Sequence, residues 1–188
     1  MRLVMLGGTG SGKGTQTAKL CDRLKIPSIS TGDTLRAGIA SKTELGKQAE
    51  TYVTQGELVP DDLMIGLIQQ RLQQPDVSNG WILEGYPRTA FQAEELDFLL
   101  KKIKQKLDWA IYLKVSEAVM KERALGRGLA DDRSAVIERR IQNFQEFTVP
   151  LLEYYDYCQR LITVNGEQSA DNIVRELLEN LQSKYSVD

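Results

Sequence analysis

A glycine-rich stretch near the start of the chain carries the residue types that bind phosphate. Residues 7–16 read Gly-Gly-Thr-Gly-Ser-Gly-Lys-Gly-Thr-Gln and follow a short apolar run at 3–6. Glycines let the backbone approach a polyphosphate without Cβ clashes, and successive amide N–H groups can then surround the anion. Helix-like sequence begins near Lys13, so a helix dipole and the Lys13 ammonium add to the same site. The order of strand, glycine loop and helix predicts a phosphate-binding loop, and the alternative is a flexible glycine loop at a strand end.

Three further polar clusters follow along the chain. The cluster at 30–36 holds hydroxyls, an acid and an arginine, and taken alone it could be only a helix N-cap. The cluster at 55–60 reads alone as a helix end and the loop before the next helix. The cluster at 84–92 begins with Glu84, a carboxylate suited to holding magnesium through water, and continues to Arg88, a planar fork for bidentate phosphate contact. Its alternative is an ordinary Gly-Pro turn between a strand and a helix.

Arginines recur in the second half of the chain, at positions 123, 127, 133, 139 and 140. Arg123 and Arg127 lie four residues apart and therefore share one face of a predicted helix. Arg140 lies near the start of a longer predicted helix. For Arg133 and Arg139 we favour an exposed, charged face. The predicted acidic partners of that face are Glu117, Glu122 and Glu138.

The elements that must hold these residues alternate between strand and helix. The predicted strands are apolar runs at 2–6, 26–30, 81–83, 109–115 and 161–164. The predicted helices cover 13–24, 33–40, 44–52, 89–106 and 117–126, with others beginning near residue 60 and after Ser169, and a long one over 137–155 that Pro150 interrupts. Five buried-type strands alternating with helices predict an α/β fold, a three-layer doubly wound sandwich around a five-stranded parallel sheet. Ligands of such sheets collect at the carboxyl ends of the strands, where the polar clusters lie.

Length and composition exclude several classes of protein. The 188 residues fit one domain, and no apolar run is long enough for a membrane span. The net charge of 24 − 26 = −2 gives no global field that would attract nucleic acid or a membrane. The absence of histidine excludes Ser-His-Asp and Cys-His nucleophilic mechanisms. Cys21 and Cys158 are far apart, so we expect a reducing cytoplasm rather than a disulfide framework or a zinc site. The basic run at 101–106 lacks aromatic residues and is interpreted as a solvated helix end, not a nucleic-acid site.

Taken together, these motifs resemble the adenylate kinase family in its short-lid form, over essentially the whole chain. In the loop at 7–15, Gly14 follows Lys13 directly and the hydroxyl residue comes one position later, at Thr15. This sequence pattern is found in nucleoside monophosphate kinases. The other matching motifs are Ser30-Thr31-Gly32-Asp33, residues 56–60, Gly85-Tyr86-Pro87-Arg88-Thr89 with Gln92, Arg123-x-x-x-Arg127-Gly128, Asp131-Asp132 and Arg140. The resemblance implies one P-loop kinase domain over 1–188, with a core (1–29, 60–125 and 134–188), an AMP-binding insert (30–59) and a very short lid (126–133).

The resemblance also implies a role for each matching residue. ATP would be bound by Gly10, Ser11, Gly12, Lys13, Gly14, Thr15, Arg123, Arg127 and Gln168. AMP would be bound by Thr31, Arg36, Glu57, Leu58, Val59, Gly85, Tyr86, Pro87, Arg88, Gln92 and Arg140. The catalytic cations would be Lys13, Arg88, Arg127 and Arg140. Asp33 and Glu84 would hold Mg²⁺ through water and not directly.

The implied reaction is MgATP + AMP ⇌ 2 ADP, which serves adenine nucleotide homeostasis. Thr31, Thr89 and Gln92 favour AMP as the acceptor, because relatives that take UMP or CMP usually have a small residue at the first position and Asn at the second. The resemblance implies a cytoplasmic monomer that binds ATP, AMP and ADP with Mg²⁺, without zinc, nucleic acid or a membrane partner. The first rival interpretation is a UMP or CMP kinase.

Two positions depart from the family pattern. Leu129 stands where the pattern Arg-x-Asp-Asp would put an arginine that touches the transferring phosphate, and Arg133 is the candidate to compensate. Glu84 stands where the family usually has the shorter Asp. The second rival interpretation, a nucleotide-sensing protein with weak catalysis, rests on these departures.

Overall fold

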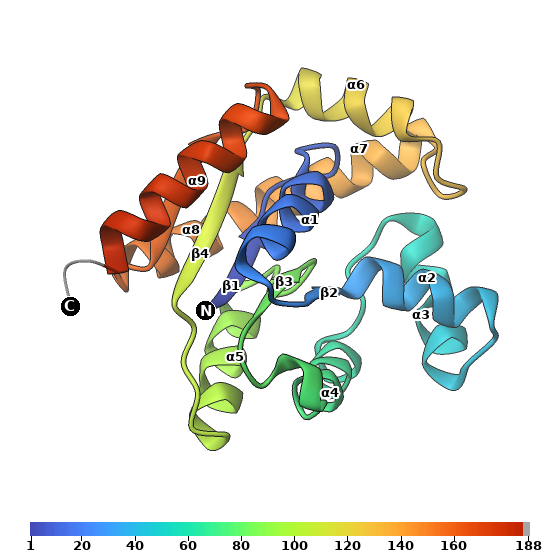
Figure 1. Cartoon of the computed structure of the whole chain (residues 1–188). Coiled ribbons are helices and arrows are strands. Elements are labelled where there is room, and N and C mark those ends of the chain that lie inside the picture. The colour runs from blue at the N-terminus through green and yellow to red at the C-terminus, as the bar shows by residue number, and fades with distance from the viewer. Residues whose placement is uncertain (186–188) are drawn as a thin grey trace.

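The computed structural model describes residues 1–185 and forms an α/β fold around a five-stranded parallel sheet (Figure 1). The strands are β1 (Arg2–Leu6), β2 (Ser28–Ser30), β3 (Trp81–Glu84), β4 (Trp109–Lys114) and β5 (Leu161–Asn165), in the order β2-β3-β1-β4-β5. The helices are α1 (Lys13–Leu24), α2 (Thr31–Ala40), α3 (Glu44–Gln55), α4 (Asp61–Leu72), η1 (Pro75–Val77), α5 (Ala90–Lys102), α6 (Glu117–Arg127), α7 (Ser134–Asn143), η2 (Phe144–Thr148), α8 (Val149–Tyr157) and α9 (Ala170–Tyr185). The predicted fold class is confirmed.

Side chains alternate along the strands, so the sheet contributes to a core on each of its faces. Val4 and Leu6 of β1 share one core with residues of α4, α5 and α8. Leu3 and Met5 share the other core with residues of α1 and α9. Both faces of the sheet are therefore buried, as is usual for parallel strands, and the fold has three layers.

The carboxyl ends of three neighbouring strands meet at one edge of the sheet. Glu84 at the end of β3 is in register with Ser30 on β2 and with Met5 on β1. The glycine loop begins just after β1, and α2 begins just after Ser30. Consequently, three polar segments that are far apart in the sequence lie side by side.

Helices α2 and α3 pack on each other and stand out from the sheet (Figure 1). Gly46 on α3 lies so close to Gly38 on α2 that an added Cβ would be 2.2 Å from the Gly38 carbonyl oxygen. Glycine at position 46 therefore allows the two helices their close approach. The pair makes up most of the predicted AMP-binding insert, 30–59, whose separate role stays a prediction.

Two helices differ from the prediction for physical reasons. α5 ends at Lys102, not 106, because Lys104 adopts a left-handed φ of 56° and the Gln105 N–H donates to the Leu100 carbonyl. The predicted long helix is interrupted, as expected near Pro150, but the interruption takes the form of the π-helical turn η2. Within residues 1–185, no helix combines the length and apolar character needed to span a membrane.

Candidate active site

The glycine loop bends tightly between β1 and α1. Gly10 and Gly12 have φ angles of 77° and 93°, in the left-handed region that favours glycine. An added Cβ on Gly10 would lie 2.1 Å from the Met120 carbonyl oxygen, so the loop packs directly on α6. Gly12 provides no side-chain cap for α1, and the first-turn amide N–H groups therefore remain available to an anion.

The Lys13 side chain folds back over its own loop. Its Nζ donates to the carbonyl oxygens of Gly7 at 2.7 Å and Gly8 at 2.8 Å. Desolvation lowers the pKa of Lys13 to about 8, while Glu84 opposes this shift and nearby arginines add to it. A polyphosphate on the loop would stabilise the ammonium and raise this pKa again.

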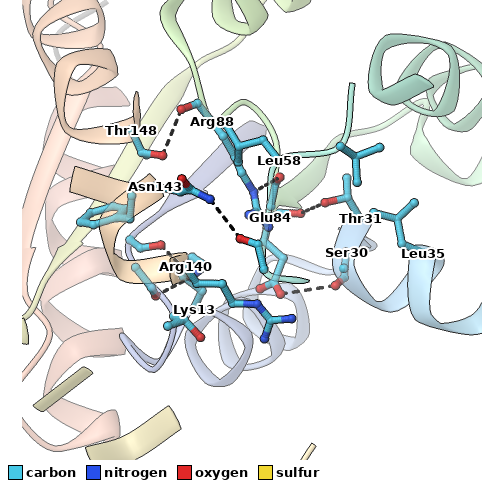
Figure 2. A pocket seen from close by; sticks show the side chains of 18 of the residues that line it. Lys13, Ser30, Thr31, Leu35, Leu58, Glu84, Arg88, Arg140, Asn143 and Thr148 are labelled. Carbon is cyan, nitrogen blue, oxygen red and sulfur yellow. Dashed lines mark hydrogen bonds between the residues drawn. The ribbon is translucent and has the colours of Figure 1, made fainter. Parts of the chain in front are cut away.

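Glu84 lies between the glycine loop and α2 (Figure 2). Its carboxylate accepts hydrogen bonds from Thr17 Oγ1 at 3.1 Å and from Ser30 Oγ at 3.4 Å. On α2, Arg36 donates a hydrogen bond of 2.5 Å to Asp33. Desolvation opposes the ionisation of Asp33, but its hydrogen bonds with Arg36 and Ser30 keep the pKa of Asp33 below the usual value. This oxygen-rich surrounding fits Mg²⁺ held through its own water molecules. Residues 1–185 contain no cluster of three or more His, Cys, Asp or Glu side chains that could hold a metal ion directly.

Arg88 is held in the cleft through its side chain and its main chain (Figure 2). Its Nε donates to the Gly85 carbonyl at 3.0 Å, and its backbone N–H donates to Gln92 Oε1 at 2.7 Å. Its carbonyl oxygen accepts a hydrogen bond of 3.0 Å from Thr148 Oγ1. The pKa of Arg88 is lowered to about 10, mainly by desolvation and also by Arg140 and Arg36, while Glu84 opposes this shift.

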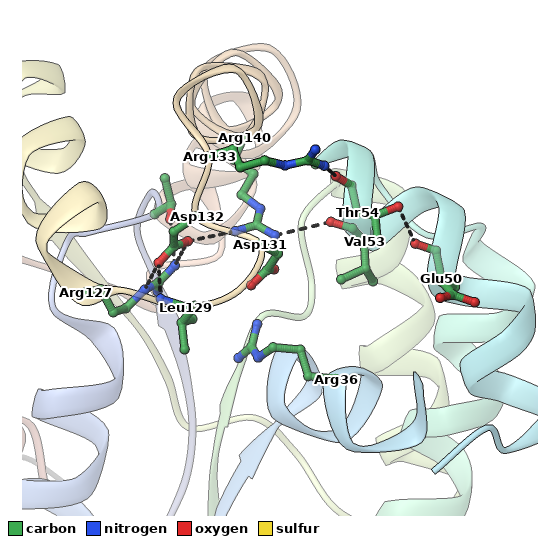
Figure 3. A network of polar contacts seen from close by, with 12 residues as sticks. Arg36, Glu50, Val53, Thr54, Arg127, Leu129, Asp131, Asp132, Arg133 and Arg140 are labelled. Carbon is green, nitrogen blue, oxygen red and sulfur yellow. Dashed lines mark hydrogen bonds and ion pairs between the residues drawn. The ribbon is translucent and has the colours of Figure 1, made fainter. Parts of the chain in front are cut away.

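Two carboxylates of the predicted lid hold two of the predicted catalytic arginines (Figure 3). Arg127 donates to Asp132 Oδ2 at 2.9 Å and Oδ1 at 2.8 Å, while Arg140 pairs with Asp131 and, at 3.2 Å, with Asp132. The hydrogen bonds that Arg127 donates to Asp132 raise the pKa of Arg127. Desolvation opposes ionisation of Asp132, yet the pKa of Asp132 stays below the usual value because of Arg127. Arg127 also donates to Thr9 Oγ1 at 3.4 Å, which joins the lid to the glycine loop.

The arginine predicted to compensate for Leu129 lies elsewhere. Arg133 donates to the Thr54 carbonyl of α3 at 3.3 Å, so its guanidinium is directed to the predicted insert (Figure 3). Arg139 forms an ion pair of 2.7 Å with Glu57. Arg133 and Arg139 are exposed, as predicted, but the prediction that Arg139 pairs with Glu117, Glu122 or Glu138 was wrong. Two of these glutamates have other partners, since Glu138 pairs with Lys121 and Glu117 accepts from Gln145.

The cleft brings together most of the predicted site residues. Those that line it are Lys13, Thr31, Arg36, Glu57, Leu58, Val59, Glu84, Gly85, Pro87, Arg88, Gln92, Arg127 and Arg140. Tyr86 is buried behind this lining, where its hydroxyl donates to the Gln92 carbonyl at 3.1 Å, and the Tyr86–Pro87 bond is cis. Other predicted residues outside the lining are Gly10, Ser11, Gly12, Gly14 and Thr15 in the loop or first turn of α1, Asp33 on α2, Arg123 on α6 and Gln168.

The two residues predicted to meet the ATP base lie near the turn after β5. Arg123 Nη1 donates to the Gly166 carbonyl at 2.8 Å. Gln168 Nε2 donates to the Asn165 carbonyl at 3.2 Å in the same turn. The structure thus brings α6 to this turn, although neither side chain lines the cleft.

Other side chains line the cleft without a predicted role, among them Leu35, Met64, Asn143, Phe144 and Thr148. The apolar ones follow helical spacing and read as ordinary core. Asn143 donates to the Gly56 carbonyl at 3.0 Å and so ties α7 to the end of α3. Asn143 and Thr148 could have been noticed in the sequence as polar residues on the apolar face of a predicted helix, just before Pro150 interrupts it.

Comparisons with known proteins agree with this geometry. The sequence profile of the adenylate kinase family matches residues 5–160. A protein named adenylate kinase 2 from Nostoc sp. is 57% identical over 181 residues, which cover 96% of this chain and 98% of the relative. Adenylate kinase 2 from Synechocystis sp. is 58% identical over 96% of this chain and 100% of the relative. Adenylate kinase from Stenotrophomonas maltophilia is 46% identical over 95% of this chain and 97% of the relative.

Proposed function

The chain belongs to the adenylate kinase family and catalyses phosphoryl transfer between ATP and AMP, and we propose that this transfer takes place in the cleft between the glycine loop and α2. One observation carries the proposal. Five cationic side chains from separate segments converge on the cleft: Lys13, Arg36, Arg88, Arg127 and Arg140. Arg36, Arg127 and Arg140 already pair with aspartates. Lys13 and Arg88 are strongly desolvated cations, and an anionic ligand that neutralises them best explains their place in the cleft.

ATP is proposed to bind with its phosphates on the glycine loop. The free amide N–H groups at the start of α1 and the Lys13 ammonium would surround the phosphates. Lys13 would exchange the carbonyl oxygens of Gly7 and Gly8 for phosphate oxygens. Arg123 and the turn at Gln168 would meet the adenine, because Arg123 of α6 already bonds to the Gly166 carbonyl in this turn.

AMP is proposed to bind on the opposite side of the cleft. Arg36, Arg88 and Arg140 would hold its phosphate and the transferred group. Thr31 and Gln92, both almost fully buried polar side chains, would recognise the adenine together with Val59. A base whose polar edge does not match these groups would bind less tightly, which is the physical basis of discrimination.

The chemistry needs no general base from the protein. The attacking AMP phosphate oxygen is already ionised at neutral pH, so the chain has to align the two nucleotides in line and neutralise charge. Lys13, Arg88, Arg127 and Arg140 are proposed to do this as the phosphoryl group moves. Closure of the insert at 30–59 and the lid at 126–133 would exclude water, a competing acceptor.

Magnesium is the proposed cofactor, held through water by Asp33 and Glu84. Bound with ATP, the ion would neutralise part of the phosphate charge. The hydroxyls of Thr17 and Ser30 orient the Glu84 carboxylate, so the extra methylene of Glu84 compared with Asp does not leave it unsupported.

We further propose that the protein acts as a cytoplasmic monomer. A single chain supplies both sides of the cleft, so no second copy is needed to complete it. Its two cysteines, Cys21 and Cys158, are free thiols, which suits a reducing compartment.

The test is a coupled assay of ADP formation from ATP with AMP, GMP, CMP or UMP, each with Mg²⁺ and with a chelator. We expect AMP to exceed the other acceptors in kcat/KM by roughly 10²-fold or more, and activity to be lost with the chelator. Equal or better use of UMP or CMP would identify a pyrimidine nucleotide kinase. Tight binding of a two-headed adenosine polyphosphate without ADP formation would indicate the nucleotide-sensing alternative.

A further inference from the structure

The π-helical turn η2 joins α7 to α8 beside the cleft, and Asn143 and Thr148 at its two ends both line the cleft. Pro150 lacks the N–H that would continue the regular helical ladder, and the Val149 N–H bonds to the Phe144 carbonyl five residues back. Residues five apart then stack on one face, which puts Asn143 and Thr148 together on the cleft side. Both are nearly fully buried, at 3% and 6% exposure, while residues 145–147 between them face outward.

Thr148 reaches from this turn to the main chain of Arg88. Its hydroxyl donates to the Arg88 carbonyl oxygen at 3.0 Å, across a sequence separation of 60 residues (Figure 2). Gln92 Oε1 accepts from the Arg88 N–H at 2.7 Å, and Gln92 is itself fixed by a 2.7 Å hydrogen bond to Asp61. Both polar groups of the Arg88 main chain are therefore bonded to side chains from two different helices.

This arrangement determines where the Arg88 guanidinium can go. Within residues 1–185 the side chain is tied only to Gly85, through Nε, so its two terminal nitrogens remain available for phosphate. The position of those nitrogens follows from the position of the Arg88 main chain, which no regular strand or helix holds. A shift of about 1 Å in a group that aligns the reacting atoms can reduce a rate by roughly 10²-fold.

We propose that Thr148 is a positioning residue for phosphoryl transfer, which acts by holding the Arg88 main chain from the π-helical turn. The proposal rests on the proposed contact of Arg88 with the transferred group. Thr148 itself need not touch either nucleotide. Its removal should therefore slow the transfer step more than it weakens ATP binding.

The test replaces Thr148 by valine, which keeps the shape and removes the hydroxyl, and by serine, which keeps the hydroxyl. In Thr148→Val we expect kcat to fall by roughly 10- to 100-fold with KM for ATP unchanged, while Thr148→Ser should retain most of kcat. The control is Thr54→Val, which removes a threonine hydroxyl bonded to the Glu50 carbonyl at 2.8 Å outside the cleft and should leave kcat unaltered. Rates are normalised to folded protein from circular dichroism, and Thr148→Ala serves as a second variant without the hydroxyl.

Three results would overturn the proposal. These are an unchanged kcat in Thr148→Val, an equal loss in Thr148→Ser, or a loss of the same size in Thr54→Val. The wild-type assay keeps this test separate from the test of function. A wild type that forms no ADP from ATP and AMP would reject the proposed function, whereas an active wild type with an equally active Thr148→Val would reject only the role of Thr148.

Discussion

The two sides of the cleft are built in different ways. The side proposed to hold ATP phosphates is one continuous stretch, residues 7–16, whose backbone amides and single lysine provide the chemistry. The side proposed to hold AMP is assembled from α2, the end of α3, the segment after β3 and the α7–η2 helix. The first side depends on local backbone conformation, whereas the second depends on tertiary contacts that place side chains from distant segments.

The two sides also differ in the charge that they present. Lys13 has a pKa lowered to about 8, so the ATP side holds a cation that can lose its proton near neutral pH. The pKa of Arg88 is lowered only to about 10, so this cation of the AMP side persists. Substitutions and pH should therefore affect the two nucleotides separately.

The largest effect is expected on the ATP side. Lys13→Met should lower kcat/KM for ATP by roughly 10³-fold, because it removes the cation that follows the transferring phosphoryl group. The matched control is Lys19→Met in the same helix, whose ammonium pairs with Asp171 at 2.7 Å away from the cleft and whose loss should leave the rate unaltered. Steady-state ADP formation measures both variants. Substantial activity in Lys13→Met would break the assignment of this side to ATP.

The next largest effect is expected on the AMP side. Arg88→Ala should lower kcat/KM for AMP by roughly 10²-fold and leave the binding of ATP alone unchanged, since Arg88 faces the acceptor. Arg71→Ala is the control, because Arg71 pairs with Asp76 at 2.6 Å at the far end of α4. Kinetics with AMP as the varied substrate and calorimetry with ATP distinguish the two effects. If Arg88→Ala weakened the binding of ATP as much as it lowered kcat/KM for AMP, the two sides of the cleft could not be assigned to different nucleotides.

Raising the pH should change kcat/KM for ATP by about one order of magnitude more than kcat/KM for AMP. As pH rises through 8, Lys13 of the free enzyme loses its proton, so kcat/KM for ATP should fall about tenfold between pH 7 and 9. At saturating ATP, kcat/KM for AMP should stay nearly flat over this range, because bound phosphates restore the Lys13 proton and Arg88 keeps its charge. Initial rates at varied ATP and at varied AMP give the two profiles. Parallel falls for both nucleotides would contradict the account, and Lys13→Arg should abolish the fall.

The smallest effect is expected at the lid, which lies between the two sides. Leu129→Arg should raise kcat by roughly 3- to 10-fold, since it adds a cation near the transferring group. The gain is limited because Asp131 Oδ1, a buried oxygen without a hydrogen-bond partner, would compete for the new guanidinium. Leu129→Met is the uncharged control, and kcat at saturating nucleotides is the readout. An unchanged kcat in Leu129→Arg would show that another group already supplies this charge.

The same contrast explains which features could be predicted from the sequence. The glycine loop was recognisable because its chemistry lies in consecutive residues, and the sheet because each strand is a short apolar run. The end of α5 was missed because Lys104, not a glycine, adopts the left-handed conformation there. A residue of that type gives no sequence signal for a helix end.

The AMP side could be predicted only where a family motif names its residues. Thr148 lies within the helix predicted over 137–155, but helical spacing gives no signal for the π-helical turn or for the bond of Thr148 to Arg88, 60 residues away. The prediction of a partner for Arg139 was wrong because Glu57 lies 82 residues away in the sequence. The packing of α3 on α7 brings the two side chains together. Contacts of this kind depend on the tertiary arrangement and not on local pattern.

A crystal structure with a two-headed adenosine polyphosphate would test the central claim most directly. We predict that its phosphates run from the amides of residues 10–15 and Lys13 to Arg36 and Arg88, with one adenine near Arg123 and the other near Thr31. A ligand that leaves the glycine loop free of phosphate, or that places the second adenine away from Thr31 and Gln92, would contradict this assignment of the two sides.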